Sequence, residues 1–186
     1  ELHIPVFFSF DTKQYLRLGE TLDVSEYLAL NYPSVRLSKK RLTNKIRTNK
    51  SMASFIVNMF EKGKSHDNLD YDCITVDYFD NPESVKDYIT LLRKLGWTAI
   101  TYTTSTCTSD PYDALKEFGD YNAHGVIGQE FSKVVFVMDN NFTYGPSGKL
   151  QSKHSYYSAS GMLYQIVTRV VDVLKIIVLG NQSLYV

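Results

Sequence analysis

The sequence has little cysteine and no spacing that would put its cysteines to structural use. Its 186 residues include two cysteines, Cys73 and Cys107, and no Cys-x-x-Cys pair. Two thiols cannot build a disulfide scaffold, and the missing paired spacing argues against a structural zinc site. We therefore expect a protein of a reducing compartment, the cytoplasm, or the host-cell cytoplasm if the protein is viral.

Long apolar stretches are also absent. Runs such as Ile176-Ile-Val-Leu179 have the length of a strand, and none approaches the roughly 18 residues that a membrane-spanning helix needs. The first residues show no basic segment followed by an apolar one, so no secretory signal peptide is expected. Because the sequence begins without methionine, we expect it to be a piece of a longer chain.

Neither sign of charge is in excess, but the charges are unevenly distributed. Twenty basic and twenty acidic side chains balance over the whole chain, and hydrophobic residues make up 44% of it, enough for a folded core. Residues 67–87 carry seven acids and one base, whereas residues 36–50 carry seven bases and no acid. A polyanionic partner would therefore have to be held by a local patch. The bases of this second block are Arg36, Lys39, Lys40, Arg41, Lys45, Arg47 and Lys50.

The basic block has two interpretations. It is either a solvated helix face or a patch that neutralises phosphates of a nucleic acid, which would give salt-dependent affinity without sequence preference. An unbroken positive sign over fifteen residues is less usual for a solvated face. We predict that this block binds nucleic acid, most of all single-stranded DNA, and we predict no membrane partner.

The centre of the chain predicts a strand–helix–strand unit. Residues 73–77 and 97–103 are β-branched and apolar, as in strands. Between them, Asn81 and Pro82 are typical of a helix start, and apolar positions at helical spacing run to Gly96. The sequence predicts further strands at 4–10, 131–138, 176–179 and 184–186, and helices at 23–31, 38–47 and 154–175. The predicted class is α/β or α+β, one domain with a mixed sheet and flanking helices.

Two acids lie where the first strand of this unit ends. A carboxylate at the carboxyl end of a strand lies where open α/β sheets bind ligands. Asp77 and Asp80, joined by a third acid, would suit Mg²⁺ or Mn²⁺, because hard cations prefer oxygen ligands. The alternative is that Asp80 and Asn81 only form a turn and begin the helix.

Hydroxyl groups follow the second strand of the unit. Residues 102–108, Tyr-Thr-Thr-Ser-Thr-Cys-Thr, offer six hydroxyls and one thiol. Such a segment either grips phosphates or is an ordinary polar loop. Other motifs fail: residues 145–149 lack the residues that a phosphate-binding glycine loop requires, and no histidine has metal-site spacing.

The order of these segments resembles the archaeo-eukaryotic primase superfamily, especially the primase-polymerase domains of phages and plasmids. The similarity rests on the strand ending at Asp77, the hydroxyl-rich segment after the next strand, and the strand within residues 130–139, and it spans roughly residues 64–186. It implies a primase-like fold and metal-dependent nucleotidyl transfer on a nucleic-acid template. Residues 1–63 would then be an N-terminal part, and 64–186 the core of the same domain.

The resemblance also implies roles for single residues. Asp77 matches the first metal-binding and catalytic aspartate, and Asp172 is the best match for the last acid. Asp80 comes one position too late for the second metal ligand. The positions that match the nucleotide-phosphate contacts are Ser105, Thr106, Cys107 (where the family has histidine) and Lys133 (where it has arginine). Residues 183–186 resemble the family's final strand.

Two functions follow from the sequence. The first is a primase-polymerase with Mg²⁺ or Mn²⁺ as cofactor and nucleotides as substrates, acting in DNA replication. The second is a non-catalytic module of replication initiation that keeps the fold and the nucleic-acid groove. The departures at Asp80, Cys107 and Lys133 affect the chemistry itself, so we expect weak or absent synthesis.

The basic block leads to a first test. Replacing Lys39, Lys40 and Arg41 together by Ala should weaken binding to every sequence about equally. The dependence of log affinity on log salt should flatten by about 0.7 for each lost phosphate contact on a single strand. Titrations at several salt concentrations measure both effects. An unchanged slope would identify the block as a solvated face.

Overall fold

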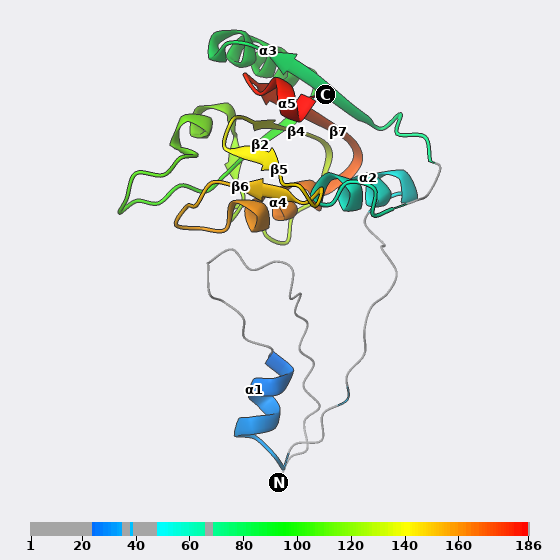
Figure 1. Ribbon diagram of the computed structural model, residues 1–186, viewed down its shortest axis with the longest axis vertical. Helices are drawn as coiled ribbons and strands as arrows, with labels where there is room; N and C mark the ends of the chain where they lie inside the picture. Colours follow the sequence, from blue (N-terminus) through cyan, green and yellow to red (C-terminus); the bar gives the residue numbers. More distant parts are fainter. Residues whose placement is uncertain (1–23, 35–37, 39–47, 66–68, 186) are drawn as a thin grey trace.

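The computed structural model describes residues 24–34, 38, 48–65 and 69–185. The predictions for residues 4–10 and for the basic helix lie outside this part of the chain, as do Arg36, Lys39, Lys40, Arg41, Lys45 and Arg47. Lys50, the last base of the block, is the first residue of helix α2 (Lys50–Phe60). Helix α1 (Val24–Asn31) matches the predicted helix and lies apart from the sheet (Figure 1).

Five parallel strands form the central sheet, in the order β1-β7-β4-β2-β3. The three strands predicted around Asp77, Thr101 and Val134 share this sheet, which confirms an α/β domain with flanking helices. Antiparallel pairing occurs in a separate hairpin, β5–β6. The strands are β1 (Ile74–Phe79), β2 (Thr98–Thr101), β3 (Tyr121–Asn122), β4 (Phe131–Met138), β5 (Phe142–Tyr144), β6 (Leu150–Ser152) and β7 (Val170–Leu179).

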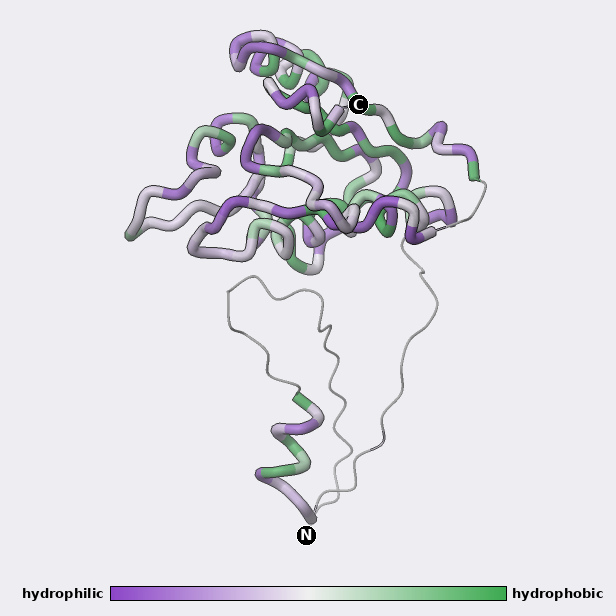
Figure 2. The backbone as a smooth tube through the Cα atoms, viewed as in Figure 1, coloured by the Kyte–Doolittle hydropathy of each residue, from purple (hydrophilic) through white to green (hydrophobic). Residues whose placement is uncertain are grey.

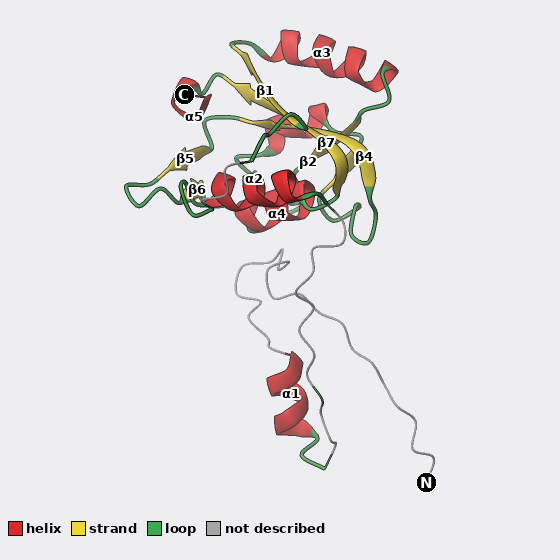
Figure 3. Ribbon diagram, turned by 90° about the vertical axis from the view of Figure 1, so that its right-hand side faces the viewer, coloured by secondary structure: helices red, strands yellow, loops and turns green. Residues whose placement is uncertain are grey.

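Strands β4 and β7 form the centre of the sheet and are covered on both faces. Residues 134–138 and 174–178 are buried without alternation, as expected where helices cover both faces of a parallel sheet. Figure 2 shows the long hydrophobic stretches of the chain in this central region. Helix α3 (Pro82–Lys94) covers one face, and α2 with α4 (Ala159–Val167) covers the other (Figure 3).

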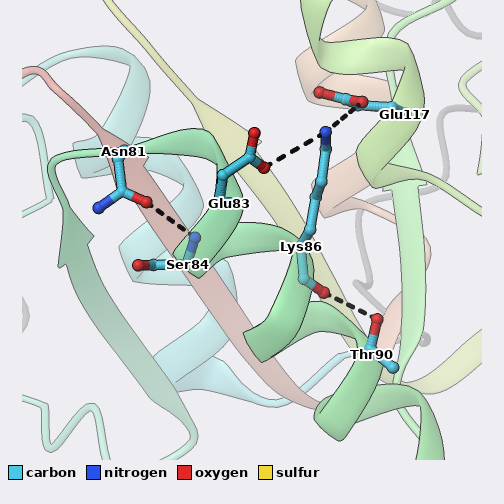
Figure 4. Close-up of polar contacts among 6 residues, drawn as sticks. All are labelled: Asn81, Glu83, Ser84, Lys86, Thr90 and Glu117. Atoms are coloured by element: carbon cyan, nitrogen blue, oxygen red, sulfur yellow. Dashed lines mark hydrogen bonds and ion pairs between the residues drawn. The ribbon is translucent and has the colours of Figure 1, made fainter.

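Helix α3 forms as its sequence predicts. The Asn81 side chain accepts a hydrogen bond from the Ser84 N–H at 2.9 Å, and Pro82 opens the helix. Val85, Ile89 and Leu92 are buried against the sheet. Lys86 lies between Glu83 of the same helix and Glu117 of the short helix η1 (Asp113–Phe118), at 3.5 and 2.9 Å (Figure 4). This exposed pair connects α3 to η1 on the same face of the sheet.

On the other face, α2 belongs to the same core as the sheet. Its Met52, Ile56 and Met59 are buried in the cluster that also holds the apolar side chains of β4 and β7. Phe60 of α2 packs edge-on against Tyr164 of α4, with ring centroids 5.7 Å apart. Among the described residues, α2 is the first element that packs into this core. No helix among the described residues has both the length and the apolar character that crossing a bilayer demands.

Two predicted elements near the C-terminus are wrong. The helix predicted over 154–175 ends at Val167, and the residues from Val170 onward belong to β7. Because β7 is buried on both faces, its apolar run also matches helical spacing, and periodicity alone does not separate the two. The strand predicted over 184–186 is replaced by the short helix α5 (Gln182–Tyr185).

A partly buried ion pair joins the edge strand β1 to β7. The Lys175 ammonium group lies 2.8 Å from Asp77 Oδ2 and donates to Thr75 Oγ1 at 2.8 Å. The Tyr88 hydroxyl of α3 donates to the same carboxylate oxygen at 2.9 Å. Burial lowers the pKa of Lys175, but the hydrogen bond to Asp77 and other contacts outweigh it, so the pKa is raised overall.

Removing one member of this pair should destabilise the fold. Asp77→Ala leaves a cation with a side chain only 11% exposed without its carboxylate. We expect a loss of about 2 kcal/mol, less than for a fully buried pair because Asp77 is partly solvated. Such a loss corresponds to a melting temperature lower by roughly 4–8 °C.

The double variant Asp77→Ala/Lys175→Met provides the comparison. It removes both charges, so thermal unfolding should show that part of the lost stability returns. If the double variant is as unstable as the sum of the two single variants, the charges do not interact appreciably.

Candidate functional site

The acids predicted to hold metal do not converge. Asp77 pairs in register with Ile177, whereas Asp172 lies five residues earlier on β7, about 16 Å along the strand. Asp172 accepts a hydrogen bond from Ser132 at the amino end of the sheet. Asp80 is exposed after β1, and the hydrogen bond that it accepts from the Tyr78 hydroxyl is the main cause of a raised pKa of that tyrosine. Asp77 and Asp80 therefore lie at the carboxyl end of β1, whereas Asp172 lies at the amino end of the sheet, and each acid has its own partner.

A two-ion site does not fit this arrangement. Such a site needs carboxylates close enough to share two ions that lie roughly 4 Å apart. Asp77 instead neutralises Lys175 and accepts the Tyr88 hydroxyl. Throughout the described part of the chain, no three His, Cys, Asp or Glu side chains are grouped so that they could hold a metal ion. No catalytic step through Mg²⁺ or Mn²⁺ is therefore derived for these residues.

The predicted nucleotide contacts lie at two opposite edges of the sheet. Ser105, Thr106 and Cys107 belong to the loop after β2, at the carboxyl edge. The Ser105 hydroxyl oxygen accepts hydrogen bonds from the N–H groups of Cys107 and Thr108 at 3.1 and 3.2 Å. Lys133 lies near the start of β4, at the amino edge, where its ammonium group donates to the Leu95 carbonyl. The loop and the lysine therefore do not form one site.

At the carboxyl edge, β2 and β4 are neighbours whose connections leave toward opposite faces. The connections from β1 and β2 place α3 and η1 on one face, whereas the connection from β4 leads to α4 on the other. Open α/β sheets commonly bind ligands in the crevice at such a point. Here three aromatic rings occupy it: Tyr102, Tyr112 and Phe142, with centroids 5.1 to 5.4 Å apart.

This aromatic cluster is buried next to a partly buried acid, Asp139. All three rings are at most 1% exposed, and burial raises the pKa of the Tyr102 hydroxyl well above its usual value. Burial also raises the pKa of Asp139, although Asn141 donates to its carboxylate through both the backbone N–H and the side-chain amide. The crevice is thus closed by the chain's own side chains, and a ligand at this edge would have to lie outside them.

The outer layer of the carboxyl edge is made by three segments. The first is the hydroxyl-rich loop after β2, which is exposed at residues 106–108. The second is the turn containing His124 after β3, and the third is residues 153–158, which lead into α4. The Tyr112 hydroxyl donates to the Lys153 carbonyl at 3.2 Å, and the Tyr156 N–H donates to Asp110 at 3.3 Å. These bonds hold the third segment beside the end of the first.

His124, which belongs to the second segment, connects that segment to the first. Its Nδ1 lies 2.7 Å from the Thr103 hydroxyl, which also accepts the His124 backbone N–H at 3.2 Å. The imidazole packs against Tyr157, with ring centroids 4.6 Å apart. The Thr103 N–H donates to the sulfur of Met162 in α4. The first turn of α4 therefore lies next to the hydroxyl-rich loop.

The N-terminus of α4 adds positive potential to this surface. The nine-residue helix is capped by Ser158, whose hydroxyl oxygen accepts the Gly161 N–H at 3.1 Å. Because α4 returns from the carboxyl edge to the amino edge, its positive end and its first N–H groups are at the carboxyl edge. Helix N-termini of this kind favour anions.

Basic side chains continue this surface along the β5–β6 hairpin. Lys149, Lys153 and His154 are exposed, and Lys62 at the end of α2 lies over the Tyr144 ring at 4.2 Å. The Lys62 N–H donates to the Gly148 carbonyl at 2.9 Å, which fixes the hairpin against α2. From Asn140 to Val171 the chain contains no Asp or Glu. We call Lys62, Lys149, Lys153 and His154 the basic strip.

Sequence reasoning missed most of this surface. His124 shows no metal spacing, and its pairing with Thr103 depends on a contact across 21 residues. The absence of acid from residues 140–171 is a signal that was available in the sequence. The basic strip became visible only when the hairpin was placed beside α2 and the carboxyl edge.

Comparisons with known proteins add a weak structural similarity. No protein-family model and no curated protein matches the sequence. Among solved structures, the chain is similar to the C-terminal domain of a possible DNA helicase from Lactobacillus plantarum, with 14% identity and a TM-score of 0.42. The similarity covers 74% of this chain and 89% of that one. A similarity at this level supports no conclusion about function.

Proposed function

We propose that this chain is a nucleic-acid-binding domain that contacts phosphates at the carboxyl edge of its sheet. One observation carries the proposal. The hydroxyl-rich loop, His124 and the N-terminus of α4 form an outer layer there, with hydrogen bonds between Thr103 and His124 and between Tyr112 and Lys153, and the basic strip continues from Lys153 along the hairpin. Of the two functions that the sequence suggested, this is the non-catalytic one.

The donors of this layer suit a phosphodiester backbone. Hydroxyl groups, backbone N–H groups and a helix N-terminus bind phosphate oxygens through directional hydrogen bonds. Lysines supply the charge that releases counterions and strengthens binding at low salt. Thr106 and Thr108 are exposed in the loop, and Lys149 and Lys153 are exposed on the hairpin. The layer therefore offers both kinds of contact side by side.

The local charge is favourable although the whole chain is neutral. Three carboxylates near this layer have partners within the fold: Asp110 accepts the N–H groups of Tyr112 and Tyr156, Glu61 pairs with Lys64, and Asp139 accepts hydrogen bonds from Asn141. The hydrogen bond from Lys64 is the main cause of a lowered pKa of Glu61, and the nearby charge of Lys149 also lowers it. The acids of residues 67–87 belong mainly to β1, α3 and the segments flanking them. Nucleic acid would approach the other side of the fold.

Nucleotidyl transfer is the function that the donor geometry does not support. Asp77 is bound to Lys175, and Asp172 lies at the opposite end of the strands. We therefore expect no divalent-dependent incorporation of nucleotides on a primed or unprimed template. Incorporation that is abolished by Asp77→Asn, while the variant stays folded, would contradict this and restore the catalytic interpretation.

Neutralising the basic strip should weaken binding. In the variant Lys149→Ala/Lys153→Ala, affinity for a labelled oligonucleotide should fall. The slope of log affinity against log salt should flatten by about 0.7 for each lost contact on a single strand. Fluorescence anisotropy at several salt concentrations measures both quantities.

A matched variant separates local contacts from net charge. Lys94→Ala/Lys116→Ala removes two exposed lysines from α3 and η1, on the other face of the sheet. It changes the net charge by the same amount but should leave the salt slope unaltered. Equal losses of oligonucleotide affinity in the two variants would show that binding depends on overall charge and not on this surface.

A further inference from the structure

The carboxyl edge carries an exposed aromatic ring beside the hydrogen-bond donors that would bind phosphate. Tyr156 is 46% exposed, although its backbone is firmly held. Its N–H donates to Asp110, and the buried Ser155 hydroxyl next to it donates to the Tyr157 carbonyl at 2.6 Å. A large ring on a fixed backbone loses little conformational freedom when it binds a partner.

The ring of Tyr156 is the outermost of three. His124 packs on Tyr157 at 4.6 Å, and Tyr157 packs on Tyr156 at 4.8 Å with the two planes nearly perpendicular, at 89°. In a perpendicular pair one ring meets the other with its edge, so at least one face of Tyr156 is left uncovered by Tyr157. Tyr157 therefore lies between His124, a residue of the proposed phosphate-binding surface, and the open face of Tyr156.

We infer that Tyr156 is a base-stacking residue that makes this surface select single-stranded nucleic acid. The inference rests on the proposed function, because a base reaches Tyr156 only if neighbouring phosphates lie along the carboxyl edge. Both faces of a base inside a duplex are already stacked on its neighbours, whereas a single strand exposes them. Stacking on an aromatic ring tolerates any base, so this selection is by strandedness and not by sequence.

The most direct experiment compares an oligo-dT strand with a strand of equal length that carries abasic sites. The two strands have the same phosphates, so the difference between them measures the bases alone. The wild-type chain should bind oligo-dT about tenfold more tightly than the abasic strand, as expected for one stacked base. Tyr156→Ala should lose that preference and bind both strands with the affinity that the wild-type shows for the abasic one.

Conservative and control variants identify the cause. Tyr156→Phe and Tyr156→Trp keep an aromatic face and should retain the preference. Tyr185→Ala removes a tyrosine of similar exposure, 48%, from α5. This variant should keep the wild-type preference for oligo-dT over the abasic strand. Affinity for a duplex should be the same for wild type and Tyr156→Ala.

The results also separate this inference from the proposed function. If the wild-type chain binds both strands equally and Tyr156→Ala has no effect, the stacking role is wrong while phosphate binding stands. If Tyr156→Ala lowers the affinity for the two strands and for the duplex alike, the residue is structural and the inference is also wrong. If the wild-type binds no nucleic acid at all, both are wrong. Because the strand comparison uses the wild-type chain, it does not depend on the folding of any variant.

Discussion

The burial of β4 and β7 on both faces is the constraint on which the rest of this structure depends. Their buried runs, residues 134–138 and 174–178, are apolar except for Lys175 and require covering layers above and below. Parallel neighbours also require connections that cross the sheet, and these supply the covering helices α3 and α4. All of these connections begin at the carboxyl edge of the sheet. That edge is therefore where distant loops gather.

The same constraint explains the ion pair of Lys175. Lys175 interrupts the apolar run of β7 on the side that α3 covers, and a buried ammonium group needs a carboxylate partner. Asp77 of the neighbouring strand and Tyr88 of α3 provide the partners. The acid that resembles a catalytic aspartate in the sequence thereby joins the edge strand, the central strand and a helix.

Unlike the region of the ion pair, where charged groups are partly buried, the carboxyl edge has an apolar interior and a polar exterior. Tyr102, Tyr112 and Phe142 fill the crevice where a nucleotide would lie in a related architecture. The hydroxyl groups, lysines and rings of the outer layer therefore lie on the solvent side of this cluster. A surface of this kind suits an extended polyanion more than an enclosed small ligand, and it agrees with a binding role.

By itself, the sequence determined the class of the fold, the helix that begins at Asn81, and three strands of the sheet, because caps, β-branched runs and helical spacing act locally. It did not determine where the helix before β7 ends, since a strand buried on both faces has no periodicity of its own. The tertiary structure alone decided which charges meet. Asp77 and Asp172 look like partners along the chain, but register places them at opposite ends of the sheet. Thr103, His124 and Lys153, which lack any common motif, share one edge because the strand order brings their loops together.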